Sequence, residues 1–277
     1  MYKIFFLLFL SLNFFKGFSQ PLDTAKVSVF YSFSHARDTM FLNKFNTENF
    51  VLQLGKNISV YKSIDQAAAD SARNAVIEKA RINFESTGQM NINMQGVKTA
   101  TGNLIYKNTV NNTMVFVNPF MRINYFIEEA MPTINWVITE ETKQVQTLTC
   151  QKATTKFRGR NYEAWFCPEF PYNSGPWKFN GLPGLIIEVY DSKEEVIFLL
   201  NKIEINKDQI VLINYPEKYQ KTTAKEYTQL REGIKANPEA FLNGQMNTLS
   251  AGTTMSIKAT TTMGRKTYNN PIELSKD

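Results

Sequence analysis

Histidine and cysteine are scarce in this chain of 277 residues, which contains one histidine, His35, and two cysteines, Cys150 and Cys167. Zinc sites draw most of their three or four protein ligands from His and Cys, so a single histidine without a neighbouring His or Cys cannot build one. A Ser-His-acid triad would have to use the same His35, and no Gly-x-Ser-x-Gly motif accompanies it. We therefore predict no metal and no other cofactor, and interpret His35 as a solvated loop residue.

Long apolar runs are missing beyond the N-terminus. Residues 4–15 are almost wholly apolar, follow Lys3, and precede the small residues Gly17 and Ser19. This pattern is typical of a secretory signal peptide, cleaved between Ser19 and Gln20. The run is too short for a membrane-spanning helix, which needs about 20 residues. We expect a soluble mature chain that is periplasmic or secreted and is not an integral membrane protein.

The net charge of the chain is also small. The formal net charge of +6 falls to +4 when Lys3 and Lys16 leave with the signal peptide. A charge this mild favours solubility and does not predict a nucleic-acid partner. The chain has no internal repeat and no Pro/Ser-rich linker, so one domain is the simplest organisation. We predict a signal peptide over residues 1–19, a single β-rich domain over 20–258, and a mobile C-terminal tail over 259–277.

Short segments rich in β-branched and aromatic residues recur along the chain. Tight turns between consecutive segments predict an antiparallel sheet, and only residues 64–80 and 223–235 have a helical pattern. The predicted fold is therefore mainly β (α+β): a curved antiparallel sheet or half-barrel with one or two helices packed on it. Strands are expected near residues 27–34, 49–54, 59–62, 104–106, 113–117, 124–128, 135–139, 145–155, 162–167, 185–189, 196–205 and 209–213, with polar turns at 140–143 and 157–160, and a short helix at 237–242.

Glycine and proline are concentrated in one place. Residues 175–184 contain three glycines and two prolines, which excludes regular structure there. Residues 185–189 then alternate in a way that suits a buried strand. Trp177 and Phe179 are spaced to fold back over an apolar surface. We interpret this stretch as a structural corner that covers the core; the alternative is a loop that contacts a ligand.

This corner also carries a family resemblance. Its central residues resemble the motif of the GLPGLI family, a set of secreted Bacteroidetes proteins with no assigned reaction, and the resemblance is densest over residues 136–191. The sheet-plus-helix pattern is also similar, at the level of fold only, to the LolA-like lipoprotein carriers of the bacterial envelope. The residues that match the family motif are Gly181, Leu182, Pro183, Gly184, Leu185 and Ile186.

The register of one hairpin decides the state of the cysteines. If the hairpin turns on Arg158 and Gly159 alone, Phe157 faces Arg160, and Cys150 then faces Cys167. A three-residue turn with a bulge at Gly159 would place the two cysteines on opposite faces. We predict a disulfide, which an exported chain permits and which would stabilise the fold by about 3 kcal/mol in the chain-entropy model. A redox or metal-binding pair is the alternative, but the spacing is too wide for Cys-x-x-Cys chemistry.

Candidate ligand-binding residues fall into two groups. The aromatic side chains Trp136, Trp165, Trp177 and Phe179 could hold a flat or apolar ligand on a concave sheet, although such clusters usually form core. Arg158 and Arg160 could grip a phosphate or carboxylate, although charged hairpin tips commonly protect a sheet edge.

Two functions remain open. The first is an exported, non-enzymatic cell-envelope protein that binds an apolar ligand or an envelope partner protein in the hollow of its sheet. The second is a secreted hydrolase or peptidase-associated accessory protein that uses scattered carboxylates. Adjacent carboxylates such as Glu128 and Glu129 point to opposite faces of a strand, which argues against a shared acid–base site. No sequence motif identifies a catalytic residue either.

Overall fold

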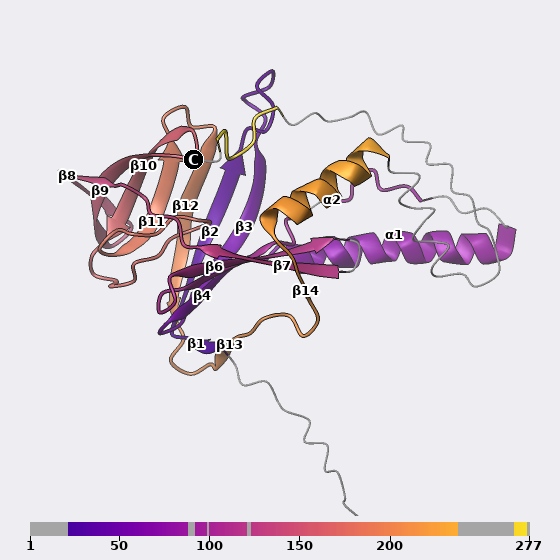
Figure 1. The fold of residues 1–277 in the computed structure, drawn as a ribbon, viewed down its shortest axis with the longest axis horizontal. Helices are drawn as coiled ribbons and strands as arrows, with labels where there is room; N and C mark the ends of the chain where they lie inside the picture. Colours follow the sequence, from indigo (N-terminus) through magenta and orange to yellow (C-terminus); the bar gives the residue numbers. More distant parts are fainter. Residues whose placement is uncertain (1–21, 88–91, 99, 121–122, 238–268, 276–277) are drawn as a thin grey trace, which may run out of the picture.

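A computed structural model describes residues 22–87, 92–98, 100–120, 123–237 and 269–275. This part of the chain is mainly β, with two helices and one large sheet (Figure 1). None of its helices is long and apolar enough to cross a membrane. The predicted signal peptide over residues 1–19 and most of the helix predicted at 237–242 lie outside the described residues.

The large sheet has twelve strands in the order β14-β7-β6-β5-β4-β3-β2-β12-β11-β10-β9-β8, and it is open at both ends rather than closed into a barrel. Neighbouring strands are antiparallel except for β14, which is parallel to β7. A separate pair joins β1 to β13. The strands are β1 (Asp23–Ala25), β2 (Val27–His35), β3 (Asn46–Leu54), β4 (Ile58–Ser63), β5 (Leu104–Asn108), β6 (Thr113–Phe120), β7 (Ile123–Ala130), β8 (Val137–Val145), β9 (Leu148–Phe157), β10 (Arg160–Cys167), β11 (Leu185–Asp191), β12 (Val196–Ile205), β13 (Val211–Ile213) and β14 (Gln220–Lys221).

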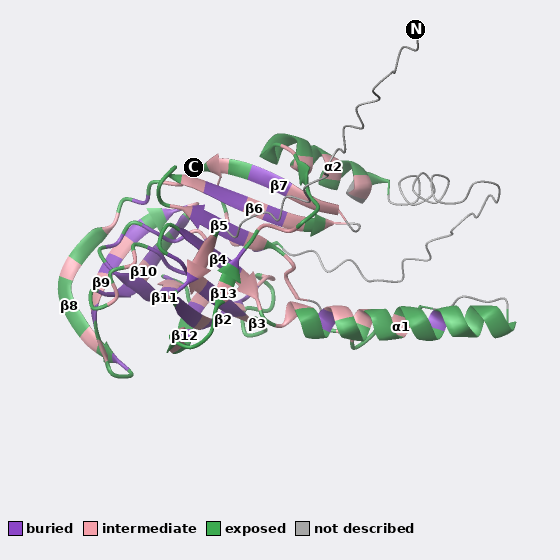
Figure 2. Ribbon diagram, turned by 90° about the horizontal axis from the view of Figure 1, so that it is seen from below, coloured by how far each residue is buried: buried purple, intermediate pink, exposed green. Residues whose placement is uncertain are grey.

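The helices do not cover the sheet as the sequence predicts. Helix α1 (Gln66–Thr87) follows β4 and projects away from the sheet, with Ala69 and Ala80 as its buried residues (Figures 1 and 2). Helix α2 (Ala224–Ala236) begins at a capping box formed by Thr223 and Glu226, and its Tyr227 contacts Tyr125 of β7, the strand next to the edge strand β14. The predicted turn at residues 140–143 is wrong, because β8 runs through it with an irregular register and turns only after Val145. A polar edge strand is easily mistaken for a turn, since its side chains face water on both sides.

The hairpin between β9 and β10 confirms the two-residue turn. Phe157 pairs with Arg160, and both Arg158 (φ 50°) and Gly159 (φ 79°) have positive φ, as a type I′ turn requires. The cysteines nevertheless remain free buried thiols, so the predicted disulfide is not formed. The β9–β10 ladder ends one residue short of them, at Gln151 and Phe166, and β10 is irregular at that point where it pairs with β11. Burial raises the pKa of the Cys150 thiol to about 11, which keeps it protonated.

Residues 168–184, which we call the Gly/Pro loop, cover one face of the sheet, here called the inner face. Phe179 and Leu182 of this loop are fully buried against the inner face, where Phe179 contacts Tyr162 and Phe198. The strand that follows, β11, is buried over Leu185–Ile187, as the sequence predicts. A smaller apolar cluster lies on the opposite face of β4–β7, beneath the β1–β13 pair.

Two glycines explain the course of this loop. Gly181 has a φ of +95°, a conformation that side-chain-bearing residues rarely adopt. Gly184 lies directly against the backbone at the end of β10, where an added Cβ would meet the carbonyl oxygen of Cys167 at 2.4 Å. The close approach at Gly184 is what lets the chain leave the loop and enter β11 as an interior strand.

We predict that Gly184→Ala lowers the free energy of unfolding by about 1–3 kcal/mol, because the added methyl group overlaps rigid backbone. Gly233→Ala in α2 is the matched control: nothing lies within 4 Å of its Cβ position, so it should stabilise the protein by about 0.5–1 kcal/mol through helix propensity. Urea unfolding followed by circular dichroism measures both changes. Equal, small effects of the two substitutions would contradict this account of the loop.

Candidate binding site

Buried polar side chains of the sheet bind the backbone of the Gly/Pro loop. The ammonium group of Lys107, on β5, donates hydrogen bonds to the carbonyl oxygens of Gly175 (2.7 Å) and Phe179 (2.6 Å). The hydroxyl of Tyr31, on β2, donates to the carbonyl of Ile186 (2.7 Å), just beyond the loop. Lys107 thus satisfies two carbonyl groups of the irregular loop, and the bond from Tyr31 fixes the start of β11 directly after it, so the loop is held in position over the inner face.

Next to the loop, the inner face contains a cavity of about 360 Å³ that we call the aromatic pocket. Its walls come from β2–β6, β12, the Gly/Pro loop and residues 269–275, so segments far apart in the sequence build it together. Most of the wall is aromatic or aliphatic, and the remainder is polar. The lining residues are Phe33, His35, Arg37, Phe50, Tyr61, Thr101, Asn103, Ile105, Phe116, Asn118, Trp177, Lys178, Phe198, Ile272 and Glu273.

The aromatic rings of the wall are stacked on one another. Phe50 and Tyr61 are nearly parallel, with ring centroids 4.7 Å apart. Phe33 stacks on Phe198 at 4.6 Å and meets Phe50 edge-on at 6.0 Å. These rings come from four neighbouring strands and are each held by another ring, so the wall is rigid and presents flat surfaces.

Two polar atoms on this wall have no hydrogen-bond partner although they are buried: the hydroxyl of Tyr61 and Nε2 of His35. Burial raises the pKa of Tyr61 well above its usual value, so the phenol is neutral. Burial, together with the positive charges of Arg37 and Arg160, lowers the pKa of His35 to about 4 against opposing effects of the Asn270 backbone and Asp191. The solvated loop position predicted for His35 is therefore wrong, because its segment continues β2 into the interior.

An ion pair closes one side of the pocket. The ammonium group of Lys178, in the Gly/Pro loop, lies 2.5 Å from the carboxylate of Glu273. The same ammonium group lies over the rings of Phe116 (4.8 Å) and Trp177 (5.6 Å). Lys178 thus connects the loop, the sheet and residues 269–275 at the rim of the pocket.

Residues 269–275, which we call the C-terminal segment, are held by Arg160. The guanidinium group of Arg160 donates to the carbonyl oxygens of Pro271 (2.8 Å) and Ile272 (3.1 Å) and to the side-chain oxygen of Asn270 (2.5 Å). It also pairs with Asp191 (2.6 Å) and Glu195 (3.0 Å). A buried arginine therefore binds residues 269–275 to the sheet, whereas residues 259–268 of the predicted C-terminal tail lie outside the described residues.

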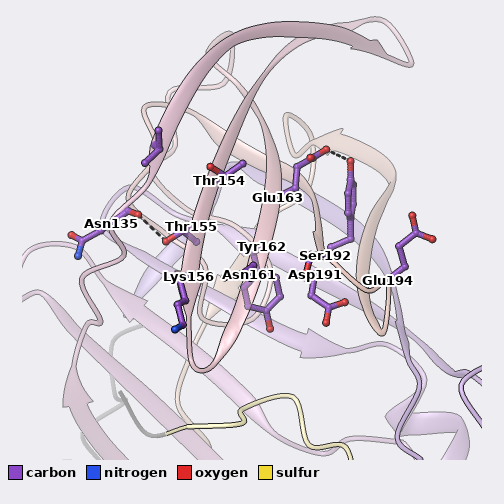
Figure 3. Close-up of a pocket in the computed structure, with 12 residues that line it drawn as sticks. Asn135, Thr154, Thr155, Lys156, Asn161, Tyr162, Glu163, Asp191, Ser192 and Glu194 are labelled. Atoms are coloured by element: carbon purple, nitrogen blue, oxygen red, sulfur yellow. Dashed lines mark hydrogen bonds between the residues drawn. The ribbon is translucent and has the colours of Figure 1, made fainter. Parts of the chain in front are cut away.

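A larger, shallower hollow of about 600 Å³ opens beside β9, β10 and β11 (Figure 3). Its most organised group is the carboxylate of Glu163, which accepts hydrogen bonds from Tyr190 and from the indole of Trp165 and pairs with Lys152. Burial alone would raise the pKa of Glu163, but these hydrogen bonds outweigh it and the pKa lies below the usual value. Glu163 is therefore an ionised, internally paired group. Asp191 follows Tyr190 on β11 and pairs with Arg160 instead, so the two carboxylates do not face each other.

The predicted ligand-binding residues separate into different places. Trp177 lines the aromatic pocket, Phe179 is packed inside the core, and the indole of Trp136 binds the Asn180 carbonyl at the edge of the loop. Trp165 belongs to the opposite face, where the Lys143 ammonium lies 4.3 Å from its ring. Arg158 forms the hairpin turn and accepts the Leu274 amide with its carbonyl. The donors of Arg160 are all bound within the protein, so it offers none to a ligand.

Sequence reasoning missed the residues that form most of the pocket wall. Phe33 and Phe50 stand in strands that were predicted, and alternation along those strands could have placed both on one face. Nothing in the sequence indicated that the Gly/Pro loop covers this face rather than the other. Tyr61 and Phe198 belong to the same wall because of the way their strands pair in the sheet, and the sequence alone does not indicate this pairing.

Comparisons with known proteins add one short match. A family model named Porph_ging, described as a protein of unknown function, matches residues 157–188, which contain β10 and the Gly/Pro loop. This match supports a resemblance to a Bacteroidetes-associated family of unknown function; the GLPGLI name and the likeness to LolA-like carriers are not confirmed. No curated protein matches the chain.

Solved structures show only a distant likeness. Two structures of PNGF-II, in the P21 and C2 space groups, are 11% and 10% identical to this chain, each with a TM-score of 0.49. Each match covers 75% of this chain and 32% of the PNGF-II chain, so this chain spans about a third of the length of PNGF-II. A likeness at this level assigns neither fold nor activity.

We predict that Lys107 makes stability depend on pH. Burial lowers its pKa from 10.5 to about 7, so between pH 7 and 10.5 the unfolded chain binds more protons and the folded state gains stability as pH rises. Relative to Lys107→Met, the unsubstituted protein should gain up to about 2–3 kcal/mol between pH 7 and 9. Denaturant unfolding at both pH values measures this difference.

Lys202→Met is the control, because Lys202 is an exposed lysine on the same sheet. Its substitution should change stability equally at both pH values. A constant difference between Lys107→Met and the unsubstituted protein across this range would show that Lys107 keeps its ordinary pKa.

Proposed function

We propose that this chain is an exported, non-enzymatic cell-envelope protein that binds a flat, largely apolar ligand in the aromatic pocket. The observation that carries the proposal is the pocket wall, where stacked rings surround about 360 Å³ and two buried polar atoms lack partners. Ligand pockets typically have this size and this mixture of apolar wall and few polar groups. The pocket lies on the inner face of the sheet, which supports the expectation that a ligand binds on this sheet.

The unpaired atoms indicate what the polar edge of the ligand should offer. A buried polar group without a partner costs about 1–3 kcal/mol, so a ligand that supplies the partner gains that amount. The neutral phenol of Tyr61 can donate a hydrogen bond. The Asn270 backbone raises the pKa of His35, as a carbonyl that accepts a ring N–H would, and this leaves Nε2 as an acceptor. A ligand that both accepts and donates at one edge therefore fits the wall best.

Export rests on the N-terminal pattern of Lys3 followed by an apolar run and small residues. The hydrolase alternative finds no specific support in the described residues. An acid–base pair needs two carboxylates that face a common space, whereas Glu163 and Asp191 are each paired with a cation or hydroxyl of their own.

We predict saturable binding of 1-aminoanthracene, a flat apolar amine, by delipidated protein. Phe116→Ala should weaken this binding by about tenfold, because Phe116 lines the pocket and is only partly buried without a ligand. Tyr61→Phe should preserve the fold and weaken binding of probes that carry an acceptor, such as anthraquinone. Fluorescence titration of the protein with the amine, and competition by anthraquinone, measure the affinities.

Phe30→Ala is the matched control, because Phe30 is a partly buried phenylalanine of β2 that does not line the pocket. Its affinity for both probes should equal that of the unsubstituted protein. Absence of saturable binding after delipidation would refute the proposal, as would equal weakening by Phe116→Ala and Phe30→Ala.

A further inference from the structure

The loop between β2 and β3 exposes an unusual set of apolar side chains. Met40 is 80% exposed, Phe41 47%, Leu42 45% and Phe45 43%. All nine residues from 39 to 47 are exposed, so this segment, called the hairpin tip, stands clear of the rest of the described chain. It projects beyond the end of the sheet (Figure 1). Four large apolar side chains within six residues form a patch of the kind that marks a contact surface.

The hairpin tip is held in shape although it contacts little else. The amide of Phe41 donates to the Asp38 carbonyl (3.0 Å), and the amide of Lys44 donates to the Phe41 carbonyl (2.9 Å). The carboxylate of Asp38 accepts the Met40 amide (2.9 Å). At its base, the side-chain oxygen of Asn269 accepts the Thr39 amide (2.8 Å). These hydrogen bonds fix the backbone of the tip in two successive turns and attach its base to the C-terminal segment. The apolar side chains therefore remain exposed to water.

The charged groups of the hairpin tip favour an anionic surface. Lys44 is the only charged residue among residues 39–47, and the carboxylate of Asp38, just before them, is turned back onto the backbone of the tip. The Lys44 ammonium lies 4.6 Å from the centre of the Phe41 ring. An ammonium group on a flexible stem beside an apolar ring can stay at the level of lipid phosphates while the ring enters the acyl region.

The size of the patch distinguishes a bilayer from a folded partner. A stable protein–protein interface takes about 20–30 residues from each side, far more than the nine exposed residues of the tip. A lipid bilayer needs no complementary surface, and it accepts a narrow apolar protrusion to a depth of about 5–10 Å.

We propose that the hairpin tip binds the protein to the surface of a membrane that contains anionic lipids, with Met40, Phe41, Leu42 and Phe45 inserted at the headgroup boundary. This inference goes beyond ligand binding in the aromatic pocket and stands on a separate surface. The two lie close together, because His35 and Arg37 line the pocket and the tip begins at the next residues. Docking would bring the pocket rim to the membrane surface.

Co-sedimentation with vesicles tests the proposal, using the chain from Gln20 onward, which retains every described element. Phosphatidylcholine vesicles with added phosphatidylglycerol should bind the protein more tightly than phosphatidylcholine alone. The pair Phe41→Ser and Leu42→Ser should weaken binding at least tenfold. Lys44→Gln should weaken binding only to the vesicles that contain phosphatidylglycerol. Met40→Trp should add a fluorescence component that shifts to shorter wavelength when vesicles are added.

The matched control is the pair Val110→Ser and Ile210→Ser, which removes side chains 69% and 83% exposed from turns elsewhere. Its vesicle binding should stay within twofold of the unsubstituted chain, and Ile210→Trp should give no wavelength shift. Failure of the unsubstituted chain to bind either vesicle, or equal losses in both serine pairs, would overturn the proposal. A dimer that the Phe41 and Leu42 substitutions dissociate, without vesicle binding, would identify the tip as a self-contact instead. The tip variants should bind 1-aminoanthracene as the unsubstituted chain does, so that a loss of vesicle binding can be attributed to the tip and not to damage to the aromatic pocket.

Discussion

The buried guanidinium of Arg160 is the interaction on which the architecture around the pocket depends. Its five N–H groups donate to Asp191, Glu195, Asn270, Pro271 and Ile272, so a single side chain joins the start of β10, the β11–β12 turn and a segment more than a hundred positions later. A buried charge without its partners costs about 3–5 kcal/mol. Loss of the C-terminal segment would leave three of the five N–H groups of Arg160 without partners. The arginine therefore favours this segment staying in place, and with it the pocket wall that the segment supplies.

A second constraint comes from the Gly/Pro loop, whose irregular backbone runs over an apolar face. Irregular segments usually lie in water because their carbonyl groups need partners. Here Lys107 reaches up from the sheet and provides two of them, which explains why a lysine occupies the interior of β5, and Tyr31 binds the Ile186 carbonyl just beyond the loop. The two carbonyl contacts offset part of the cost of burying the Lys107 ammonium group, and the part that remains lowers its pKa. Loop, sheet and C-terminal segment thus form one continuous wall.

The sequence predicts those parts of this arrangement that depend on local patterns. Alternation and turn residues located nearly all the strands, and the positive φ required at Arg158 and Gly159 follows from a two-residue hairpin. Contacts between residues far apart in the sequence produce no local pattern from which they could be predicted. The binding of Arg160 to Asn270 spans 110 positions, and its role cannot be distinguished from that of an exposed hairpin arginine by composition. The burial of His35 could not be predicted either, because it depends on which distant residues cover the end of β2. For the cysteines, the predicted hairpin register is correct, but no disulfide forms.

Departures from ordinary folding rules occur in and beside the aromatic pocket, and others lie elsewhere in the described chain, such as the unpaired hydroxyl of Tyr162 and the exposed side chain of Ile210. Buried polar atoms usually have partners and large apolar side chains usually avoid water, yet Tyr61 and His35 break the first rule and Met40 and Phe41 break the second. His35, Met40 and Phe41 lie within seven positions of one another at the end of β2. On the opposite face of β4–β7, the β1–β13 pair covers an apolar cluster in the ordinary way. Because sequences settle such conflicts wherever stability alone matters, the unpaired atoms of the aromatic pocket and the exposed apolar side chains of the hairpin tip beside it are the features on which the two binding proposals rest.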